Sequence, residues 1–278
     1  KIEGIYNALV LGVRDYFIKN NLKTAVIGLS GGLDSAVTLA IVADAIGNKN
    51  TMALLMPTKY SSTHSIEDSI EMAKRCEISY NIVNLEKLRN EFENTLADIF
   101  VGTEPNVAEE NIQARLRGSI LMAYSNKFGN IVLNTSNKSE FAVGYSTLYG
   151  DMNGAMSVLG DVYKTDVYHL GYFINKTRGN IIPENILTKA PSAELRFDQK
   201  DSDSLPDYDI LDNILYDYIE QNLSADEIEF KGVDRKIIDR VLKMLKFSEY
   251  KRFQSPPILR VSSKAFGSGR KIPIVTKC

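Results

Sequence analysis

The most constraining feature of this sequence is a short glycine-rich segment between two apolar stretches. Residues 25–29 are apolar and include β-branched side chains, residues 30–35 read Ser-Gly-Gly-Leu-Asp-Ser, and residues 36–43 are again apolar. This order predicts a strand, a tight loop and a buried helix. The loop amides and the first helical N–H groups then lack partners, and the helix dipole favours negative charge beside them. The segment is therefore predicted to bind phosphate.

The residues of this loop also restrict the kind of phosphate site. Gly31 and Gly32 are expected to let the backbone curl around an anion at φ values that a Cβ would forbid. A Walker loop would end in Lys followed by Ser or Thr, whereas Asp34 and Ser35 stand here. An acidic residue beside polyphosphate implies a bridging divalent cation. The loop resembles the pyrophosphate-binding loop of the ATP pyrophosphatase superfamily; the alternative is an ordinary turn with Asp34 as a first-turn acid.

Composition excludes several classes of function. The 278 residues carry 33 Lys and Arg against 35 Asp and Glu, and this net charge of −2 favours neither nucleic acid nor an anionic membrane. No apolar stretch approaches the ~18 residues of a membrane span. Two cysteines and two histidines are too few for a disulfide framework or a His-rich metal site. We therefore expect a cytoplasmic protein without nucleic-acid or membrane partners.

Alternating apolar patterns predict an α/β fold with a doubly wound, mostly parallel sheet. The expected strands are residues 24–29, 51–56, 79–84 and 130–134. The expected helices are residues 34–46, 65–76, 85–100 and 108–127. An opening helix with apolar residues at helical spacing from Ile5 to Phe17 should pack on the sheet.

The character of the chain changes after about residue 176. We expect one domain over residues 1–278, with a nucleotide-binding core at about 20–176 and a helical and tail segment at about 177–278. In that segment, residues 192–205 should form a surface loop, and residues 208–221 and 233–247 amphipathic helices. The sequence indicates no separate hydrophobic core there.

A second group of charged residues follows the fourth expected strand. Glu140 and Asp151 stand eleven residues apart, and Lys164 follows thirteen residues later. Carboxylates close to bound ATP would cost about 4 kcal/mol per like-charge contact at an effective dielectric of ~20, whereas Mg²⁺ binds both carboxylates and phosphate oxygens. Asp34 and Glu140 are therefore predicted metal ligands, and Lys164 is predicted to neutralise phosphate charge. The alternative is a set of solvated charges.

Several longer motifs resemble those of NAD synthetases. They are Asn-Lys-Ser-Glu at residues 137–140, Val-Gly-Tyr-Ser-Thr-Leu-Tyr-Gly-Asp-Met at 143–152, and the segments 109–118 and 189–196. The similarity runs over essentially the whole chain. It is nearest to the synthetase domain of the glutamine-dependent enzymes, whose Met-Pro-x-x-Tyr-Ser-Ser pattern matches residues 56–62.

This resemblance implies a Rossmann-like adenine nucleotide hydrolase fold and a specific reaction. Nicotinic acid adenine dinucleotide (deamido-NAD) would present its carboxylate to the α-phosphate of ATP, so that pyrophosphate leaves and an adenylate forms. Ammonia would then displace AMP and give the amide, NAD. Mg²⁺ is the implied cofactor, ATP the co-substrate and a homodimer the implied assembly.

The resemblance also implies roles for individual residues. Pyrophosphate would be held by the loop residues Ser30, Gly31, Gly32, Leu33, Asp34 and Ser35. Mg²⁺ would bind Asp34 and Glu140, and the ATP phosphates would lie near Thr135, Lys164 and Ser192. Deamido-NAD would contact Asn111, Arg115 and Asp151, with Lys251 closing over the site. Asp34 and Lys164 would be the catalytic residues.

Other residues of the motifs are open to two interpretations. Asn111 and Arg115 stand four residues apart and can present to one ligand from one helix face, although a solvated face is the alternative for Arg115. Tyr145 and Tyr149 could cover a ligand ring or pack in the core. His64 and His169 fall outside the motifs, so little acid–base help from histidine is expected.

The nitrogen donor expected for this chain is free ammonia. Glutamine-dependent relatives carry an amidase domain with a catalytic cysteine, whereas Cys76 and Cys278 do not stand in a nucleophile setting. Such a domain or partner can be missing from this chain, and an ammonia-dependent protein and an excised domain both remain open. Two other functions are weighed against the synthetase: an adenylating enzyme for a purine nucleotide, and a nucleotide sensor without turnover.

Overall fold

The computed structural model describes residues 1–275, so Cys278 lies outside the described residues. Its centre is a five-stranded sheet with the order β3-β2-β1-β4-β5, and all neighbouring strands run parallel. The strands are β1 (Ala25–Gly28), β2 (Thr51–Leu55), β3 (Ser79–Ile82), β4 (Ile131–Asn134) and β5 (Met156–Ser157). The four predicted strands are confirmed, whereas the two-residue β5 was not predicted.

The order of the strands places a crevice at the carboxyl ends of β1 and β4. The chain moves outward from β1 to β2 and β3, then returns to pair β4 with the other side of β1, with Ala25 opposite both Thr51 and Ile131. Ligands of such sheets bind beyond the carboxyl ends of the strands where the order reverses. The loops that follow β1 and β4 meet at this point.

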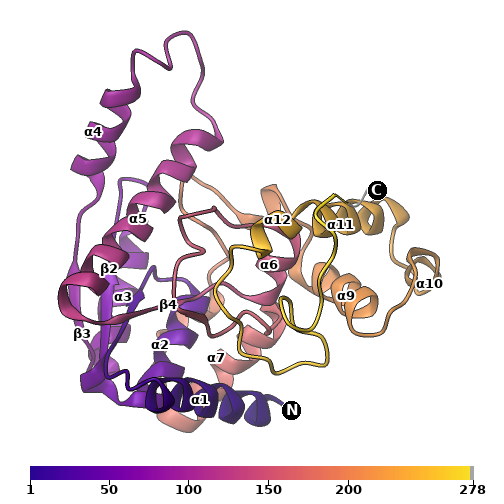
Figure 1. Cartoon of the computed structure of the whole chain (residues 1–278), viewed down its shortest axis with the longest axis horizontal. Helices are drawn as coiled ribbons and strands as arrows, with labels where there is room; N and C mark the ends of the chain where they lie inside the picture. Colours follow the sequence, from indigo (N-terminus) through magenta and orange to yellow (C-terminus); the bar gives the residue numbers. More distant parts are fainter. Residues whose placement is uncertain (276–278) are drawn as a thin grey trace.

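Helices cover both faces of the sheet (Figure 1). Alternate residues of β1 explain this arrangement, because Ala25 and Ile27 join one apolar cluster whereas Val26 joins another. The first face carries α2 (Leu33–Ile46), α3 (Thr63–Arg75) and α7 (Lys164–Arg178). The second face carries α5 (Val107–Phe128), with α4 (Glu86–Leu96) beside it. These elements confirm the predicted α/β fold with a doubly wound, mostly parallel sheet.

The opening helix, α1 (Ile2–Lys19), does not pack where the sequence predicted. Its main contacts are with α2 and α7, and it forms an outer layer beyond them. The reason is the composition of α2, which is apolar nearly all round and is buried along most of its length against the sheet. With this position filled, the apolar stripe of α1 covers the outer side of α2 instead.

The C-terminal part forms a second apolar cluster that was not predicted. It surrounds the short helix α6 (Lys138–Val143), whose Phe141 is buried, and it includes Phe266 from the tail. The helices of the C-terminal part are α8 (Glu184–Thr188), α9 (Tyr208–Ile219), α10 (Ala225–Phe230), α11 (Arg235–Phe247) and α12 (Glu249–Arg252). Residues 1–275 also contain two 3₁₀ helices, η1 (Asn48–Asn50) and η2 (Asp201–Asp203).

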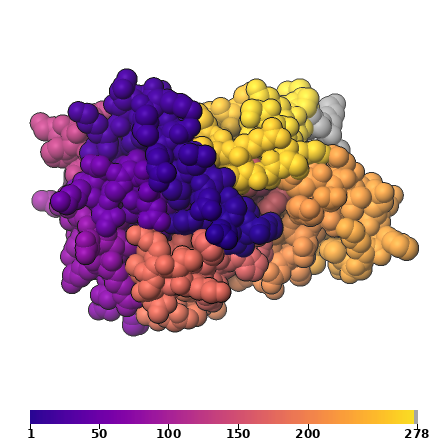
Figure 2. Space-filling model, turned by 90° about the horizontal axis from the view of Figure 1, so that it is seen from below, coloured from indigo at the N-terminus to yellow at the C-terminus, as the bar shows by residue number. Residues whose placement is uncertain are grey.

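Two further features connect distant parts of the chain. The C-terminal segment runs back beside α1, with the yellow and indigo surfaces in contact (Figure 2), and a Cβ on Gly12 would lie 2.9 Å from Leu259 Cδ2. The predicted surface loop at 192–205 is irregular apart from η2, but Asp201 and Leu205 in it are buried. Within residues 1–275, no helix combines the length and the apolar character needed to cross a membrane.

Candidate active site

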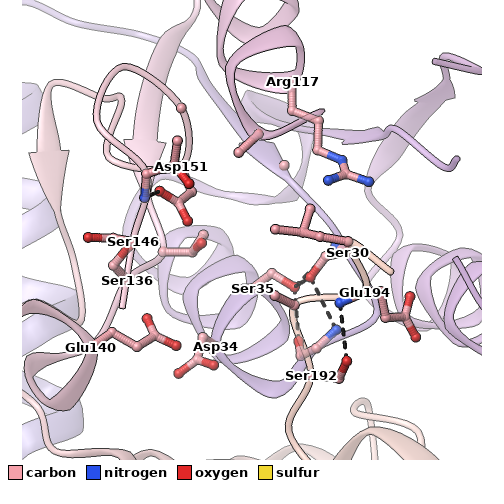
Figure 3. A pocket seen from close by; sticks show the side chains of 18 of the residues that line it. Ser30, Asp34, Ser35, Arg117, Ser136, Glu140, Ser146, Asp151, Ser192 and Glu194 are labelled. Carbon is pink, nitrogen blue, oxygen red and sulfur yellow. Dashed lines mark hydrogen bonds between the residues drawn. The ribbon is translucent and has the colours of Figure 1, made fainter. Parts of the chain in front are cut away.

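A cavity of about 570 Å³ lies beyond the carboxyl ends of β1 and β4 (Figure 3). Its walls come from the loop after β1, the loop after β4, one side of α5, the start of α7, the irregular segment after α8, and α12. Every residue that the sequence analysis assigned to the site lines this cavity. They are Ser30, Gly31, Gly32, Leu33, Asp34, Ser35, Asn111, Arg115, Thr135, Glu140, Asp151, Lys164, Ser192 and Lys251.

The loop after β1 has the geometry of an anion site. Gly31 has a φ of +80°, and a Cβ there would lie 2.4 Å from the Ser65 carbonyl oxygen. Gly32, the N-cap of α2, has an ordinary φ of −90°, so the expectation that both glycines adopt forbidden φ values is wrong for Gly32. The Ser30 and Ser35 hydroxyls lie 3.2 Å apart beside the N-terminus of α2. The Ser30 N–H donates to the Ser35 hydroxyl and the Gly32 N–H donates to the Ser30 hydroxyl, each at 3.3 Å, so amides and hydroxyls gather where the helix dipole is positive.

Asp34 and Lys164 form an ion pair across the cavity floor. Asp34 is in the first turn of α2, and Lys164 is the first residue of α7 and is buried. Asn137 donates a hydrogen bond of 2.9 Å from Nδ2 to Asp34 Oδ1. The loop after β4 is thus held against the phosphate loop by a direct side-chain contact.

Glu140 reaches the same place from the start of α6. Its backbone N–H donates to Asn137 Oδ1 at 3.0 Å, and Glu140 Oε2 accepts from the Asn137 N–H at 3.1 Å, which completes a capping box. Figure 3 shows the carboxylates of Glu140 and Asp34 facing one another. Local helix capping and the sheet topology together create this pair of acids.

The electrostatics of the pair favour an additional cation. Burial, and then the neighbouring Asp34, raise the pKa of Glu140 well above its ordinary value. Burial lowers the pKa of Lys164, but Asp34 and Glu140 outweigh that effect and the net pKa is raised. One lysine therefore faces two carboxylates in a region of low dielectric, and the negative charge is only partly neutralised.

The donor set fits Mg²⁺ rather than a metal held by protein alone. Among residues 1–275, no group of three or more His, Cys, Asp or Glu side chains could form a complete metal cage. Asp34 and Glu140 supply two hard oxygen ligands, and Mg²⁺ typically takes one or two carboxylates and completes its shell with phosphate oxygens and water. Their position beside the phosphate loop suits that mode of binding.

The predicted dinucleotide residues meet at one turn on another wall of the cavity. The Thr147 hydroxyl donates to Asn111 Oδ1 at 2.7 Å, and the Thr147 N–H donates to Asp151 Oδ1 at 2.7 Å. Arg115 Nε donates to the Leu148 carbonyl oxygen at 3.2 Å. Asp151 is exposed to the cavity but lies deep in the protein, and this burial raises its pKa to about 6.

Lys251 lies at the rim of the cavity, on α12. Its Nζ donates to the carbonyl oxygens of Gly144 at 2.7 Å and Ser146 at 2.6 Å. The adjacent Arg252 is buried and donates to the Phe141 carbonyl oxygen at 2.9 Å, which anchors α12 to α6. Lys251 thus lines the cavity, and its closure over a ligand stays a prediction.

A sequence model of the family described as NAD synthase matches residues 5–255. The chain belongs to the NAD synthase family. The glutamine-dependent NAD(+) synthetase of Acinetobacter baylyi is 49% identical over 275 residues, which are 99% of this chain and 51% of that protein. This chain thus spans about half the length of the curated relatives it matches.

Two solved structures of relatives resemble the fold over most of the chain. The glutamine-dependent NAD+ synthetase of Acinetobacter baumannii in complex with ADP is 44% identical with a TM-score of 0.66, and the alignment covers 98% of this chain and 49% of that one. The NMN synthetase of Francisella tularensis is 28% identical with a TM-score of 0.78, covering 91% and 96%.

Some residues of this NAD synthase family site were quoted in motifs but given no role. Glu194 accepts hydrogen bonds from Lys189 and, at 2.9 Å, from the Ser65 hydroxyl, so it ties the segment after α8 to α3. Arg117 is half-buried and donates to the Met56 carbonyl oxygen at 3.2 Å. It lies near Ser30 in Figure 3, opposite Glu140. Asp201 also lines the cavity but lies outside these motifs, and it had no signal in the sequence beyond its charge.

The remaining aromatic and histidine residues of interest differ in whether they line the cavity. Tyr145 lines the cavity and also packs on the C-terminal apolar cluster, whereas Tyr149 is 65% exposed and does not line it. His64 and His169 have exposed side chains and do not line this cavity. Cys76 is buried at the C-cap of α3.

Proposed function

We propose that this chain catalyses the ATP-dependent amidation of deamido-NAD to NAD, with release of AMP and pyrophosphate. The observation that carries the proposal is the meeting of the phosphate loop with Asp34, Glu140 and Lys164 in one cavity. Such a site neutralises and orients a polyphosphate without a nucleophilic side chain, and this is what transfer of an adenylyl group requires.

ATP is proposed to place its β and γ phosphates on the loop after β1. The α2 N-terminus, the hydroxyls of Ser30 and Ser35, and the Lys164 ammonium would hold the charge that develops on departing pyrophosphate. Thr135 and Ser192 line the same cavity and would complete the phosphate contacts. Mg²⁺ bound at Asp34 and Glu140 would supply additional neutralisation of phosphate charge.

The carboxylate of deamido-NAD is proposed to lie between the phosphate loop and the Asn111 wall. A carboxylate oxygen would bond to the α-phosphorus of ATP while the bond to pyrophosphate breaks. Ammonia would then attack the carbonyl carbon, with loss of a proton, and AMP would leave with the bonding electrons. Asn111, Arg115 and Asp151 would hold the dinucleotide in position for both steps, and Lys251 would cover it.

The nitrogen donor of this chain is proposed to be free ammonia. Within the part of the chain that the structure describes, no cysteine lines the cavity, and Cys76 is buried elsewhere. The relative from Acinetobacter baylyi is named as glutamine-dependent and is about twice as long as the matched region. We further propose one synthetase domain over residues 1–278, a homodimer and a cytoplasmic location.

The proposal is tested by NAD formation from deamido-NAD, ATP and Mg²⁺ in parallel reactions with ammonium chloride and with glutamine. Ammonium alone should support NAD formation, with one AMP and one pyrophosphate released for each NAD. NAD formed equally well from glutamine would contradict the assigned donor. AMP and pyrophosphate without any NAD would contradict deamido-NAD as the substrate.

A second candidate substrate follows from the similarity to an NMN synthetase. Nicotinic acid mononucleotide carries the same reacting carboxylate but lacks the adenylate half of the dinucleotide. The same reaction with this compound therefore separates the two possibilities. A higher kcat/KM for the mononucleotide than for deamido-NAD would overturn the dinucleotide assignment, and nucleotide binding without turnover of either would favour a sensor.

A further inference from the structure

Helix α7, which begins with Lys164, is capped by residues of two other helices. Its N-cap residue, Tyr163, makes no side-chain capping bond. The Lys164 N–H instead donates to the Ser139 hydroxyl at 2.9 Å, and the Thr165 N–H donates to Asp212 Oδ2 at 2.9 Å. These acceptors stand on α6 and α9, so neighbouring helices satisfy amide groups that the first turn of a helix leaves open.

Asp212 joins the start of α7 to the start of α6. It lies on α9, which packs against both helices (Figure 1), and it is 4% exposed. While Oδ2 accepts from Thr165, Oδ1 accepts a hydrogen bond from the Ser139 hydroxyl. Thr165 directly follows Lys164 in the chain, and Ser139 directly precedes Glu140. One carboxylate therefore bonds to the chain neighbours of both charged residues of the site.

The charge of Asp212 suits this position. Burial raises its pKa to about 6, while the hydrogen bonds from Ser139 and Thr165 oppose that rise. The side chain is therefore ionised at pH 7, and both of its oxygens can accept hydrogen bonds. The positive end of a helix dipole opposes a lysine in the first turn but favours a carboxylate beside it. Asp212 thus offsets the cost of placing Lys164 at the start of α7.

We propose that Asp212 is a positioning residue, which fixes the Lys164 ammonium and the Glu140 carboxylate in the relative positions that bind magnesium pyrophosphate. The proposal rests on the proposed amidation, in which pyrophosphate leaves this site. Asp212 does not line the catalytic cavity, so it acts through its hydrogen bonds to Ser139 and Thr165 and not by contact with a ligand.

The first test measures binding without turnover, by calorimetric titration of the full chain with pyrophosphate in the presence of Mg²⁺. Asp212→Ala removes both acceptor oxygens and should weaken pyrophosphate binding about tenfold, the scale of one charged hydrogen bond. Asp212→Asn keeps an oxygen for the Thr165 N–H and an amide that can donate to Ser139 Oγ, so its affinity should stay within about threefold of wild type.

Two results of this titration would overturn the proposal. One is an Asp212→Ala protein that binds pyrophosphate as tightly as wild type. The other is equal weakening in Asp212→Asn and Asp212→Ala, because the effect would then follow the charge of residue 212 and not the two hydrogen bonds. A wild type that fails to bind pyrophosphate with Mg²⁺ would overturn both this proposal and the proposed function.

The matched control for lost stability is Asp44→Ala. Asp44 lies on α2, pairs with Arg178 at the last residue of α7 and accepts a hydrogen bond from Tyr6, and it does not line the catalytic cavity. Both alanine variants should lower the free energy of unfolding in urea, but Asp44→Ala should keep the wild-type pyrophosphate affinity. An equal loss of affinity in Asp44→Ala would show that any loosening of α7 disturbs the site, and it would overturn the assignment to Asp212.

Should Asp212→Ala fail to fold, Ser139→Ala decides the proposal. This change keeps the carboxylate and its bond to Thr165 but removes the hydroxyl that joins α6 to α7. Pyrophosphate binding should weaken about three- to tenfold. Unchanged binding in Ser139→Ala would overturn the proposal.

The second test uses the assay of NAD formation. Asp212→Ala should lower kcat about 10- to 100-fold, because groups displaced from their positions stabilise the transition state less, and should change KM for deamido-NAD less than about twofold. Absence of NAD formation by the wild type would contradict the proposed function, while the titration would still decide whether Asp212 positions the phosphate site. NAD formation by Asp212→Ala at the wild-type rate would overturn the positioning role alone.

Discussion

At the scale of single residues, the site depends on a few charges that the fold brings together. Asp34, Glu140 and Lys164 stand on three different helices, α2, α6 and α7. Asn137 connects Asp34 and Glu140 by hydrogen bonds. Two carboxylates with one lysine leave a net negative charge beside the loop after β1, which has the geometry of an anion site. From this combination we expect the site to require a divalent cation when a polyphosphate is present.

Glu140→Gln tests the proposed metal ligand without disturbing the helix cap. Glutamine keeps an oxygen that can accept from the Asn137 N–H but removes the charge. NAD formation should fall at least about 100-fold, the usual cost of losing one electrostatic group of an active site, and half-saturation should need more Mg²⁺. The measurement is the rate of NAD formation against Mg²⁺ concentration.

The control for this variant is Glu109→Gln. Glu109 occupies the same position of the capping box of α5, where it accepts from the Asn106 N–H at 2.7 Å, and it does not line the cavity. This variant should keep the wild-type Mg²⁺ dependence. An unchanged Mg²⁺ dependence in Glu140→Gln as well would remove Glu140 from the metal site.

Asp151 should give the pH profile its acidic limb. Burial raises its pKa to about 6, so the carboxylate is charged at pH 7 and becomes protonated as the pH falls below 6. We expect kcat/KM for deamido-NAD to fall about tenfold per pH unit below that point. Asp151→Asn keeps an acceptor for the Thr147 N–H and should remove this limb at a lower overall rate. An identical acidic limb in the variant would assign it to another group.

At the scale of elements, the loop between β1 and α2 carries the largest conformational demand. Its two glycines differ, because Gly31 needs a positive φ and close approach to Ser65 whereas Gly32 does not. The close approach also fixes the loop against the start of α3. The anion site is therefore shaped by packing between two helices as well as by the loop sequence.

Gly31→Ala and Gly32→Ala form a matched pair that tests this difference. An alanine at Gly31 would adopt a strained φ and would place its Cβ 2.4 Å from the Ser65 carbonyl oxygen. The free energy of unfolding should fall by at least about 2 kcal/mol, and KM for ATP should rise. At Gly32 the nearest atom to a Cβ is Ser30 Oγ at 3.3 Å, so the loss should stay below about 1 kcal/mol. Urea unfolding measures both variants, and an equal loss of unfolding free energy in the two would contradict the difference between these glycines.

At the scale of the whole molecule, the C-terminal segment is tied to the active-site helix α6. Lys138, its first residue, is fully buried and lies 2.8 Å from Asp161 Oδ1 and 2.8 Å from Ser262 Oγ. Asp161 also accepts from the backbone N–H groups of Val261 at 2.8 Å and Ser262 at 2.6 Å. The tail thereby stabilises the helix that presents Glu140.

Asp161→Ala should destabilise the whole chain. The change leaves Lys138 buried with fewer partners and releases two backbone donors, so the free energy of unfolding should fall by about 3–5 kcal/mol. Ser262→Ala removes one hydroxyl that contacts Lys138, and the free energy of unfolding should fall by about 1–2 kcal/mol. Urea unfolding followed by circular dichroism measures both. A similar small loss in the two variants would show that the ion pair contributes little.

The sequence by itself determined the features that act over short distances. Periodicity and glycine placement within about twenty residues predict the strand, loop and helix around residue 30. The same local patterns predict the four main strands and the helix at 65–76 that follows the second strand. The residues Glu140, Asp151 and Lys164 of the motifs line one cavity, because parallel strands place the loops after their carboxyl ends on the same side of the sheet.

Only the tertiary structure decided the features that depend on contacts between distant segments. The outer position of α1 follows from the burial of α2, and the C-terminal apolar cluster needs Phe141 and Phe266 together. Gly32 could not be distinguished from Gly31 in the sequence, because φ depends on how the loop meets Ser65. The burial of Asp201 likewise arises from packing, since no local pattern records which side chains surround a charged residue.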